Sequence, residues 1–372
     1  VPVENVYIVG NPIKKGYVFG RDDDFRNIHN WIVCDGPKVI LLHGGRRSGK
    51  TSILIQILNG RLNDCAEAVF CDFHKILPRI ETEEDLPYQI GCAIVETKIF
   101  ITLKETFIDE NNDSWTVKLG KLVRECIQNI YPKKLILLCD EYESLEDLLR
   151  RKIITSQSLL WVKEILTLPI HFIMTGSSDF STHLSPIFSP VSQKLDISML
   201  SLEDTQKLIK HPVCGKLEYR ECVENLIFRL SGGHPFYVQY ICSVLINQIN
   251  SKHHRNYILK SDLDEAIQFI IRNPIGHIHE TWRSLSISEK STLAALANVI
   301  NHPDQYAKPR KILKAVKQHR FDISEKNLYE SLSRLKKETY LLYWEGEQIR
   351  FYIDLIRFWI KRYFQTGEDI ED

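Results

Sequence analysis

Short apolar segments alternate with longer amphipathic ones through the first half of the chain. Short runs rich in Val, Ile and Leu favour buried strands, whereas apolar residues recurring every three to four positions favour helices. Strands that alternate with helices in this way are typical of a parallel sheet with helices on both faces. We therefore predict an α/β domain over residues 1–198. Its predicted strands are Lys38–His43, Ala66–Phe73, Leu135–Cys139, Ile170–Thr175 and Gln193–Ile197, and its predicted helices are Asp24–Trp31, Thr51–Leu58, Glu84–Phe100 and Val117–Ile130.

The pattern changes after residue 198, where helical periodicity replaces the alternation. We predict a helical lid domain over residues 199–275. From residue 276 onward, three helical segments lead into two short strands that a Glu-Gly-Glu turn can join as a hairpin. This order indicates a winged-helix domain over residues 276–372. The predicted helices are Leu202–Ile209, Arg220–Leu230, Pro235–Asn247, Asp262–Arg272, Ser288–Asn298, Lys308–Gln318 and Glu325–Glu338, and the predicted strands are Tyr340–Trp344 and Gln348–Ile353.

A glycine-rich loop between the first predicted strand and the helix after it matches the pattern G-x-x-x-x-G-K-[ST]. Backbone N–H groups of such a loop ring phosphate groups, and its glycines permit the tight path. We expect Lys50 to contact the β- and γ-phosphates and to assist catalysis, and the Thr51 hydroxyl to bind magnesium. A chance match is the alternative, which the flanking strand and helix disfavour. The residues predicted to bind ATP or ADP here are Gly44, Gly45, Arg46, Arg47, Ser48, Gly49, Lys50, Thr51 and Ser52.

Two carboxylates follow directly after the third predicted strand. Asp140 can hold Mg²⁺, directly or through water. Glu141 is placed to polarise a water molecule for attack on the γ-phosphate, as a general base. The alternative is a strand that happens to stop at an acidic loop. Because the pair follows a phosphate loop at a suitable distance along the chain, we predict that Asp140 is a metal ligand and Glu141 a catalytic residue.

Together these motifs resemble those of the STAND nucleotide-switch ATPases, in particular the archaeal- and bacterial-type ATPase branch, which is related to the AAA+ and origin-recognition ATPases. In that family a segment like Asn11–Asp22 packs against adenine, and a strand end like Thr175–Ser178 senses the γ-phosphate. Ser231–Tyr237 resembles the Gly-x-Pro motif of the family's helical lid, whose proline touches the base. The resemblance implies an ASCE-type parallel sheet with nucleotide bound between the first two domains. The additional residues that it implies contact nucleotide are Phe19, Gly20, Arg21, Ser177 and Pro235.

One position departs from the family pattern. In the family's nucleotide-binding immune receptors, a Met-His-Asp motif follows the wing, and its histidine reads the β-phosphate of ADP. Here Ile353 stands at that place, and its side chain has no hydrogen-bond donor. Arg350 or Arg357 could substitute, or both could belong to the polar face of a strand and a helix.

Several of the expected nucleotide contacts have simpler alternatives. The guanidinium groups of Arg21, Arg46 and Arg47 suit phosphate, and the last two could instead contact a neighbouring subunit. Loop arginines are also commonly solvated. Ser177 could be a polar sensor or part of an ordinary turn at a strand end.

The balance of charge bears on nucleic-acid binding. The chain has 48 Lys plus Arg and 48 Asp plus Glu, whereas a dedicated nucleic-acid binder usually has a basic excess. Residues 308–320 carry six Lys or Arg and no acid, so this segment could contact DNA phosphates or form a solvated helix face. The helix after it is nearly neutral, which disfavours reading of DNA. We therefore rank nucleic acid below nucleotide and self-association as a partner.

Cysteine, histidine and apolar patterns indicate the compartment. Nine cysteines, an odd number without any Cys-x-x-Cys pair, indicate reduced thiols and a cytoplasmic protein. The pairs His253-His254 and His277-x-His279 do not lie near a cysteine at metal-ligand spacing, so the sequence favours no zinc site. We find no apolar run long enough for a membrane span and no signal peptide. Because the sequence begins at Val1, we expect a fragment or a processed product.

Three functional hypotheses follow. The first is a signalling ATPase of prokaryotic antiviral defence. In it bound ADP holds the domains closed, and exchange for ATP lets them rotate and form a homo-oligomer that acts on an effector or sensor domain outside this sequence. The second is a DNA-binding ATPase of the origin-recognition or transposition type. The third is a small-molecule kinase, which the long helical and winged-helix region disfavours.

Overall fold

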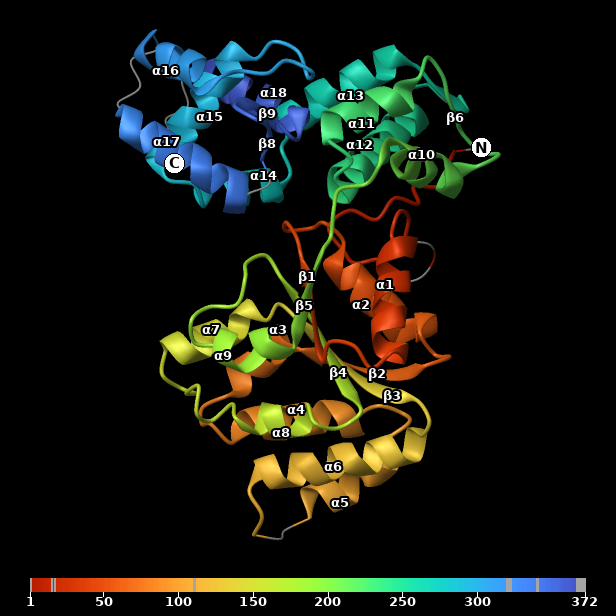
Figure 1. Ribbon diagram of the computed structural model, residues 1–372. Helices are drawn as coiled ribbons and strands as arrows, with labels where there is room; N and C mark the ends of the chain where they lie inside the picture. The colour runs from red at the N-terminus through yellow and green to blue at the C-terminus, as the bar shows by residue number, and fades with distance from the viewer. Residues whose placement is uncertain are drawn as a thin grey trace. The chain divides into compact units, whose positions relative to one another are not determined.

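The computed structural model describes residues 2–14, 16, 18–109, 112–253, 255–318, 323–338 and 341–365. Tyr17 of the opening motif, His254, residues 319–320 of the basic segment and Tyr340 of a predicted strand lie outside the described residues. The chain forms two compact units, Pro12–Ser198 and Val1–Asn11 with Met199–Asp372 (Figure 1). None of the described helices has the length and apolar character needed to cross a membrane.

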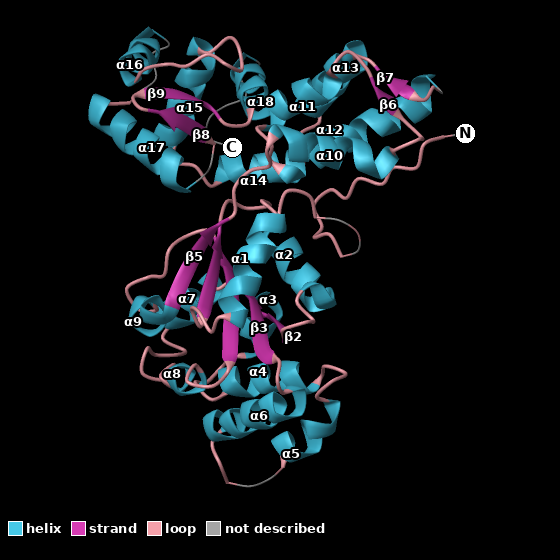
Figure 2. Cartoon of the chain, turned by 45° about the vertical axis from the view of Figure 1, so that its right-hand side comes forward, coloured by secondary structure: helices cyan, strands magenta, loops and turns pink. Residues whose placement is uncertain are grey.

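The unit formed by residues 12–198 is built on a five-stranded parallel sheet (Figure 2). The strand order is β2-β3-β4-β1-β5, so that β4 pairs with both β1 and β3. Parallel strands require crossover connections, and helices supply them here. Each of the five strands was predicted from the sequence to within one residue at either end. They are β1 Val39–His43, β2 Ala66–Asp72, β3 Lys134–Asp140, β4 Ile170–Gly176 and β5 Ser192–Asp196.

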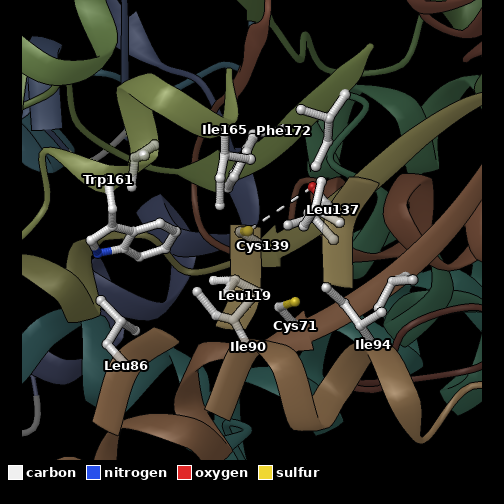
Figure 3. Packing of buried hydrophobic residues seen from close by; sticks show 14 of the residues in the cluster. Cys71, Leu86, Ile90, Ile94, Leu119, Leu137, Cys139, Trp161, Ile165 and Phe172 are labelled. Atoms are coloured by element: carbon white, nitrogen blue, oxygen red, sulfur yellow. Dashed lines mark hydrogen bonds between the residues drawn. The ribbon is translucent and has the colours of Figure 1, made fainter. Parts of the chain in front are cut away.

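Helices cover both faces of this sheet. Successive side chains of a strand point to opposite sides, so each strand contributes to two cores. Ile40 and Leu42 of β1 belong to the core beneath α1 and α2, whereas Val39 and Leu41 belong to the core on the other face. Figure 3 shows part of the second core, where Cys139 lies among apolar side chains of α4, α6 and α8. The helices of this unit are α1 Asp22–Val33, α2 Lys50–Gln56, α3 Phe73–Ile76, α4 Asp85–Val95, α5 Lys104–Ile108, α6 Trp115–Ile130, α7 Glu143–Arg150, α8 Trp161–Ile165 and α9 Ser185–Phe188.

Helix α4 is shorter than the helix predicted at residues 84–100, because it ends at Val95. The Thr97 hydroxyl donates a hydrogen bond of 2.7 Å to the carbonyl of Ile94, a local bond that competes with continuation of the helix. Helix α7, which the sequence did not predict, begins three residues after the end of β3. It carries a carboxylate that becomes important at the site described below.

The other unit combines a helical region with a winged helix. Helices α15, α16 and α17 pack on one another and precede the antiparallel hairpin β8–β9, to which a bridge between Ala307 and Ile349 adds a third short segment. The sequence predicted these elements but missed α14, α18 and the short parallel pair β6–β7. The elements of this unit are α10 Leu202–Lys210, β6 Glu218–Tyr219, α11 Val223–Ser231, α12 Pro235–Gln248, β7 Tyr257–Ile258, α13 Lys260–Arg272, α14 Gly276–Arg283, α15 Ile287–Val299, α16 Pro309–Gln318, α17 Glu325–Glu338, β8 Leu342–Glu345, β9 Gln348–Phe351 and α18 Asp354–Gln365.

The helical region and the winged helix are closely joined. Helix α18 contacts α11 and α13 as well as α15. At Gly232, whose φ is +60°, an added Cβ atom would lie 2.2 Å from the carbonyl oxygen of Tyr352, so only glycine fits there. Arg357 is 1% exposed, is paired with Asp354 and donates to the carbonyl of Ile300, so it serves the core of this unit. The domain boundary predicted at residue 275 falls inside one compact unit and stays a prediction.

The first residues of the chain pack with this second unit, although the sequence analysis placed them in the P-loop domain. Val3 exchanges main-chain hydrogen bonds with the side-chain amide of Asn250, and the Asn5 amide donates to Ser243 and Asn247 of α12. The hydroxyl of Tyr7 donates to the carbonyl of Ile209. Side-chain hydrogen bonds thus hold this extended segment against the helices of the second unit. No local pattern in the sequence contains this information.

Candidate nucleotide-binding site

The glycine-rich loop lies between β1 and α2, as the motif predicts. Gly49 adopts a φ of +101° directly before α2, a backbone conformation that favours glycine. The Lys50 ammonium donates to the carbonyl oxygens of Gly44 at 2.7 Å and Gly45 at 2.8 Å. The side chain of Lys50 therefore bridges the two ends of the loop and lies where phosphate oxygens would compete for its donors.

Residues of the opening motif form hydrogen bonds with this loop and with α2 after it. Arg21 is 2% exposed, and its guanidinium donates to the carbonyl of Ser48 at 3.1 Å and lies 3.5 Å from the Asp24 carboxylate. Ser52 accepts a hydrogen bond of 3.1 Å from the main-chain N–H of Ile13. Both side chains thus have positioning contacts inside the protein, and direct contact of either with nucleotide stays a prediction.

A carboxylate and two hydroxyl groups form the candidate magnesium site. The Asp140 Oδ1 atom accepts hydrogen bonds from the Thr51 hydroxyl at 3.1 Å and from the Thr175 hydroxyl at 2.6 Å. The Thr175 hydroxyl also accepts from the main-chain N–H of Glu141 at 2.9 Å. Oxygen ligands of this kind suit Mg²⁺, which is commonly held by one or two protein groups, phosphate oxygens and water. Asp140 and Thr51 would hold the ion, and Thr175 would orient the carboxylate.

The sequence did not predict the contact of Thr175 with Asp140 or any role for Glu143, although Thr175 belongs to the strand end that the resemblance implies senses the γ-phosphate. Thr175 reaches Asp140 because β4 lies beside β3. The Glu143 carboxylate, on the first turn of α7, accepts hydrogen bonds from the main-chain N–H and the hydroxyl of Ser177. Ser177 is thereby fixed by an acidic residue two positions after Glu141. In the sequence, Glu143 is only the third acid of the run from Asp140 to Glu143. Acids are also typical of the solvated first turn of a helix, so the run alone indicates no role for it.

Glu141 differs from Glu143 in its surroundings. Its side chain is exposed, and its φ of +57° lies in the left-handed region, which is uncommon for a residue other than glycine. Such strain is often found at functional sites. Among the described residues, the Glu141 carboxylate has no hydrogen bond to the protein, so it can accept one from water.

The remaining predicted contacts are spread over the chain. Arg46 and Arg47 are exposed in the loop, and Gly20 and Phe19 precede α1. Pro235 is the first residue of α12 in the other unit. The nucleotide contacts expected of Phe19, Gly20, Arg46, Arg47 and Pro235 stay predictions.

The pKa of Lys50 makes nucleotide binding dependent on pH. Burial lowers this pKa from its ordinary value to about 8, and the nearby carboxylates of Glu143, Asp140 and Glu141 oppose the shift. Phosphate favours the charged ammonium, so the pKa of Lys50 must rise when nucleotide binds.

We therefore expect the affinity for ADP to be highest below about pH 8 and to fall as the pH rises above it, by up to about tenfold per pH unit, until the pKa of the bound state is reached. Titration calorimetry from about pH 7 to about pH 10 measures this. Lys50→Arg serves as the comparison, because arginine keeps its charge over that range. An affinity that is constant through this range in the wild type contradicts the expected linkage.

Comparisons with known proteins agree with this geometry at the level of the fold. No protein-family model and no curated protein matches the chain. The Walker-type ATPase PABY2304 of Pyrococcus abyssi has a TM-score of 0.62 and 16% identity, over 95% of this chain and 99% of that one. Cdc6p of Pyrobaculum aerophilum has a TM-score of 0.43 and 12% identity, over 96% and 97%. A STAND protein with a tetratricopeptide repeat sensor from Pyrococcus horikoshii has a TM-score of 0.38 and 16% identity, over 94% and 43%.

The strand order, the loop between β1 and α2, and the acid at the end of β3 agree with the likeness to the first of these proteins over nearly its whole length. The fold of this chain is therefore shared with a Walker-type ATPase.

Proposed function

We propose that this chain is an ATP- and ADP-dependent molecular switch that binds Mg²⁺ with its nucleotide and hydrolyses ATP slowly. Nucleotide state sets the arrangement of the two units and the tendency of the chain to self-associate. The signal passes to an effector or sensor domain outside this sequence, and prokaryotic antiviral defence is the setting that the resemblance suggests.

The observation that carries this proposal is the shared hydrogen-bond acceptor at Asp140. Its Oδ1 atom is bonded to Thr51 of the phosphate loop helix and to Thr175 of β4. The end of β4 is also tied to the loop, because the main-chain N–H of Gly44 donates to the carbonyl of Gly176 at 3.2 Å. A magnesium ion held by Thr51 and Asp140 would thus lie one hydrogen bond away from the β4 end, through Thr175.

A switch also needs a path from the loop to the other unit. Two segments of chain connect the units, at residues 11–12 and 198–199. Ile13 is bonded to Ser52 of α2, and Ile8 is bonded to the Gln239 side chain of α12. The segment between them thus links the phosphate-loop helix to the helix that begins at Pro235. Because a ligand shifts an equilibrium only through its differential affinity for two states, such links are what a switch requires.

DNA binding is a second candidate, which one observation favours. Helix α16 exposes Arg310, Lys311, Lys314 and Lys317. None of these four pairs with an acid among the described residues. An unpaired row of cations suits phosphates, although α17 exposes acids and bases in near balance.

We expect ATP with Mg²⁺ to raise the mass of the protein in solution, and ADP or no nucleotide to leave it unchanged. Size-exclusion chromatography with light scattering measures this. Asp140→Asn should abolish the response, because it weakens the magnesium site. The double variant Lys311→Glu with Lys314→Glu should keep the response, because a solvated face is not part of the switch.

The same double variant separates the two candidate functions. Each phosphate that the protein neutralises contributes a slope of about −0.9 to log K against log salt. Nanomolar, sequence-selective binding of duplex DNA at about 0.15 M salt that the double variant loses would place DNA binding first. A mass that does not respond to ATP in the wild type would contradict self-association by a nucleotide switch.

A further inference from the structure

Three side chains with different ligand chemistry lie close together in the unit formed by residues 12–198, outside the nucleotide site. His29 lies on α1, and Asp64 and Cys65 lie in the turn that precedes β2. The Nε2 atom of His29 is 2.7 Å from Oδ2 of Asp64, and the ligand atoms of all three residues lie within 4.8 Å of one another. We propose that His29, Asp64 and Cys65 form a Zn²⁺ site, with water as the fourth ligand.

The donor set fits this ion. Zinc binds imidazole nitrogen, carboxylate oxygen and thiolate sulfur at about 2.0–2.3 Å, in tetrahedral geometry. Those bond lengths place neighbouring ligand atoms about 3.3–3.8 Å apart. This spacing lies between the 2.7 Å from His29 Nε2 to Asp64 Oδ2 and the 4.8 Å within which all three ligand atoms lie. A carboxylate and a thiolate also neutralise the charge of the ion. Harder ions such as Mg²⁺ and Ca²⁺ prefer oxygen ligands only, so the thiol and the imidazole disfavour both of them.

The backbone on both sides of the cluster is well held. His29 lies in the interior of a helix whose Ile28 and Ile32 are fully buried. The main-chain N–H of Cys65 donates to the carbonyl of Leu62, and its own carbonyl accepts from Lys134 at 2.9 Å. The side chains of His29 and Cys65 therefore stand on a backbone that is held by hydrogen bonds and packing, as a preorganised site requires. The side chains of His29 and Asp64 are 35% and 65% exposed, so an ion can reach them.

The competing interpretation is a surface ion pair between His29 and Asp64, which would contribute little to stability. In that interpretation the thiol of Cys65 keeps only its hydrogen bond of 3.6 Å to the carbonyl of Leu62. The two interpretations therefore differ in what Cys65 does, and substitution of this residue distinguishes them.

Titration calorimetry with ZnCl2 tests the proposal on the full chain after treatment with a chelator, without nucleotide or magnesium. We expect one zinc per chain in the wild type, and at least about tenfold weaker binding in Cys65→Ser and in His29→Ala. Cys34→Ser and His74→Ala are matched controls, because both residues are exposed in the same unit. They should bind zinc as the wild type does.

Two further measurements keep the result clear if a variant is poorly folded. Cobalt(II) should produce a thiolate charge-transfer absorption in the wild type that Cys65→Ser lacks. Zinc should raise the thermal unfolding midpoint of the wild type and not that of Asp64→Asn, because the ion ties α1 to the turn before β2. Absence of zinc binding in the wild type, or equal affinity in folded Cys65→Ser, would overturn the proposal. None of these measurements depends on nucleotide, so a failure of the zinc proposal can be distinguished from a failure of the proposed switch.

Discussion

Lys50→Ala should abolish measurable binding of ATP and ADP. A hydrogen bond to a charged group contributes about 1.5–3 kcal/mol, and Lys50 is placed to make more than one to phosphate. Loss of two such bonds corresponds to a dissociation constant at least about 100-fold higher. The ammonium now bonded to Gly44 and Gly45 can turn to phosphate oxygens, whereas a methyl group cannot. Titration calorimetry with each nucleotide measures the effect.

The control for this variant is Lys38→Ala. Lys38 immediately precedes β1 and is paired with the exposed carboxylate of Asp35, so its loss removes a positive charge without altering the loop. Circular dichroism should show both variants folded. A dissociation constant equal to that of the wild type in Lys50→Ala would show that the loop does not bind phosphate.

Glu141→Gln should leave nucleotide affinity unchanged and lower the rate of ATP hydrolysis by at least about 100-fold, which is the lower range for a general base. The amide has the size of the carboxylate but cannot take a proton from water. The carboxylate of Glu141 is exposed and has no hydrogen bond to the protein among the described residues. Its main-chain N–H is held by the Thr175 hydroxyl. Steady-state release of phosphate, with calorimetry for affinity, measures both quantities.

Glu143→Gln is the matched comparison, two residues further along the chain. The amide oxygen of glutamine can still accept from Ser177, so we expect a smaller loss of hydrolysis than in Glu141→Gln. The opposite order of the two variants would identify Glu143 as the base and leave Glu141 as a strained turn residue. Equal turnover in Glu141→Gln and the wild type would remove Glu141 from the chemistry.

Much of the local structure is determined by the sequence alone. Buried strands show as runs of Val, Ile and Leu, because both sides of a central strand must be apolar when helices cover both faces. The loop from Gly44 to Thr51 is recognisable because the phosphate-binding backbone needs glycine at two places and a charged and a hydroxyl side chain at its end. These requirements act within a few residues, so a local pattern records them.

The features that only the tertiary structure decided join residues far apart in the sequence. Strand order placed β4 between β1 and β3 and so brought Thr175 to Asp140, although nothing near Thr175 encodes its neighbour strand. The same applies to Glu143 and Ser177. The first residues of the chain joined the second unit, where the side chains of Gln239 and Asn250 bond the main chain of Ile8 and Val3.

The cluster of His29, Asp64 and Cys65 illustrates the same limit. The sequence favoured no zinc site because neither of the histidine pairs considered lies at ligand spacing from a cysteine. His29 meets Asp64 and Cys65 only because α1 packs against the sheet beside the entry to β2. Periodicity and motif spacing report what a residue needs from its neighbours in the chain. Contacts between distant residues depend on how the elements pack, and the side chains that meet there leave no regular spacing for the sequence to show.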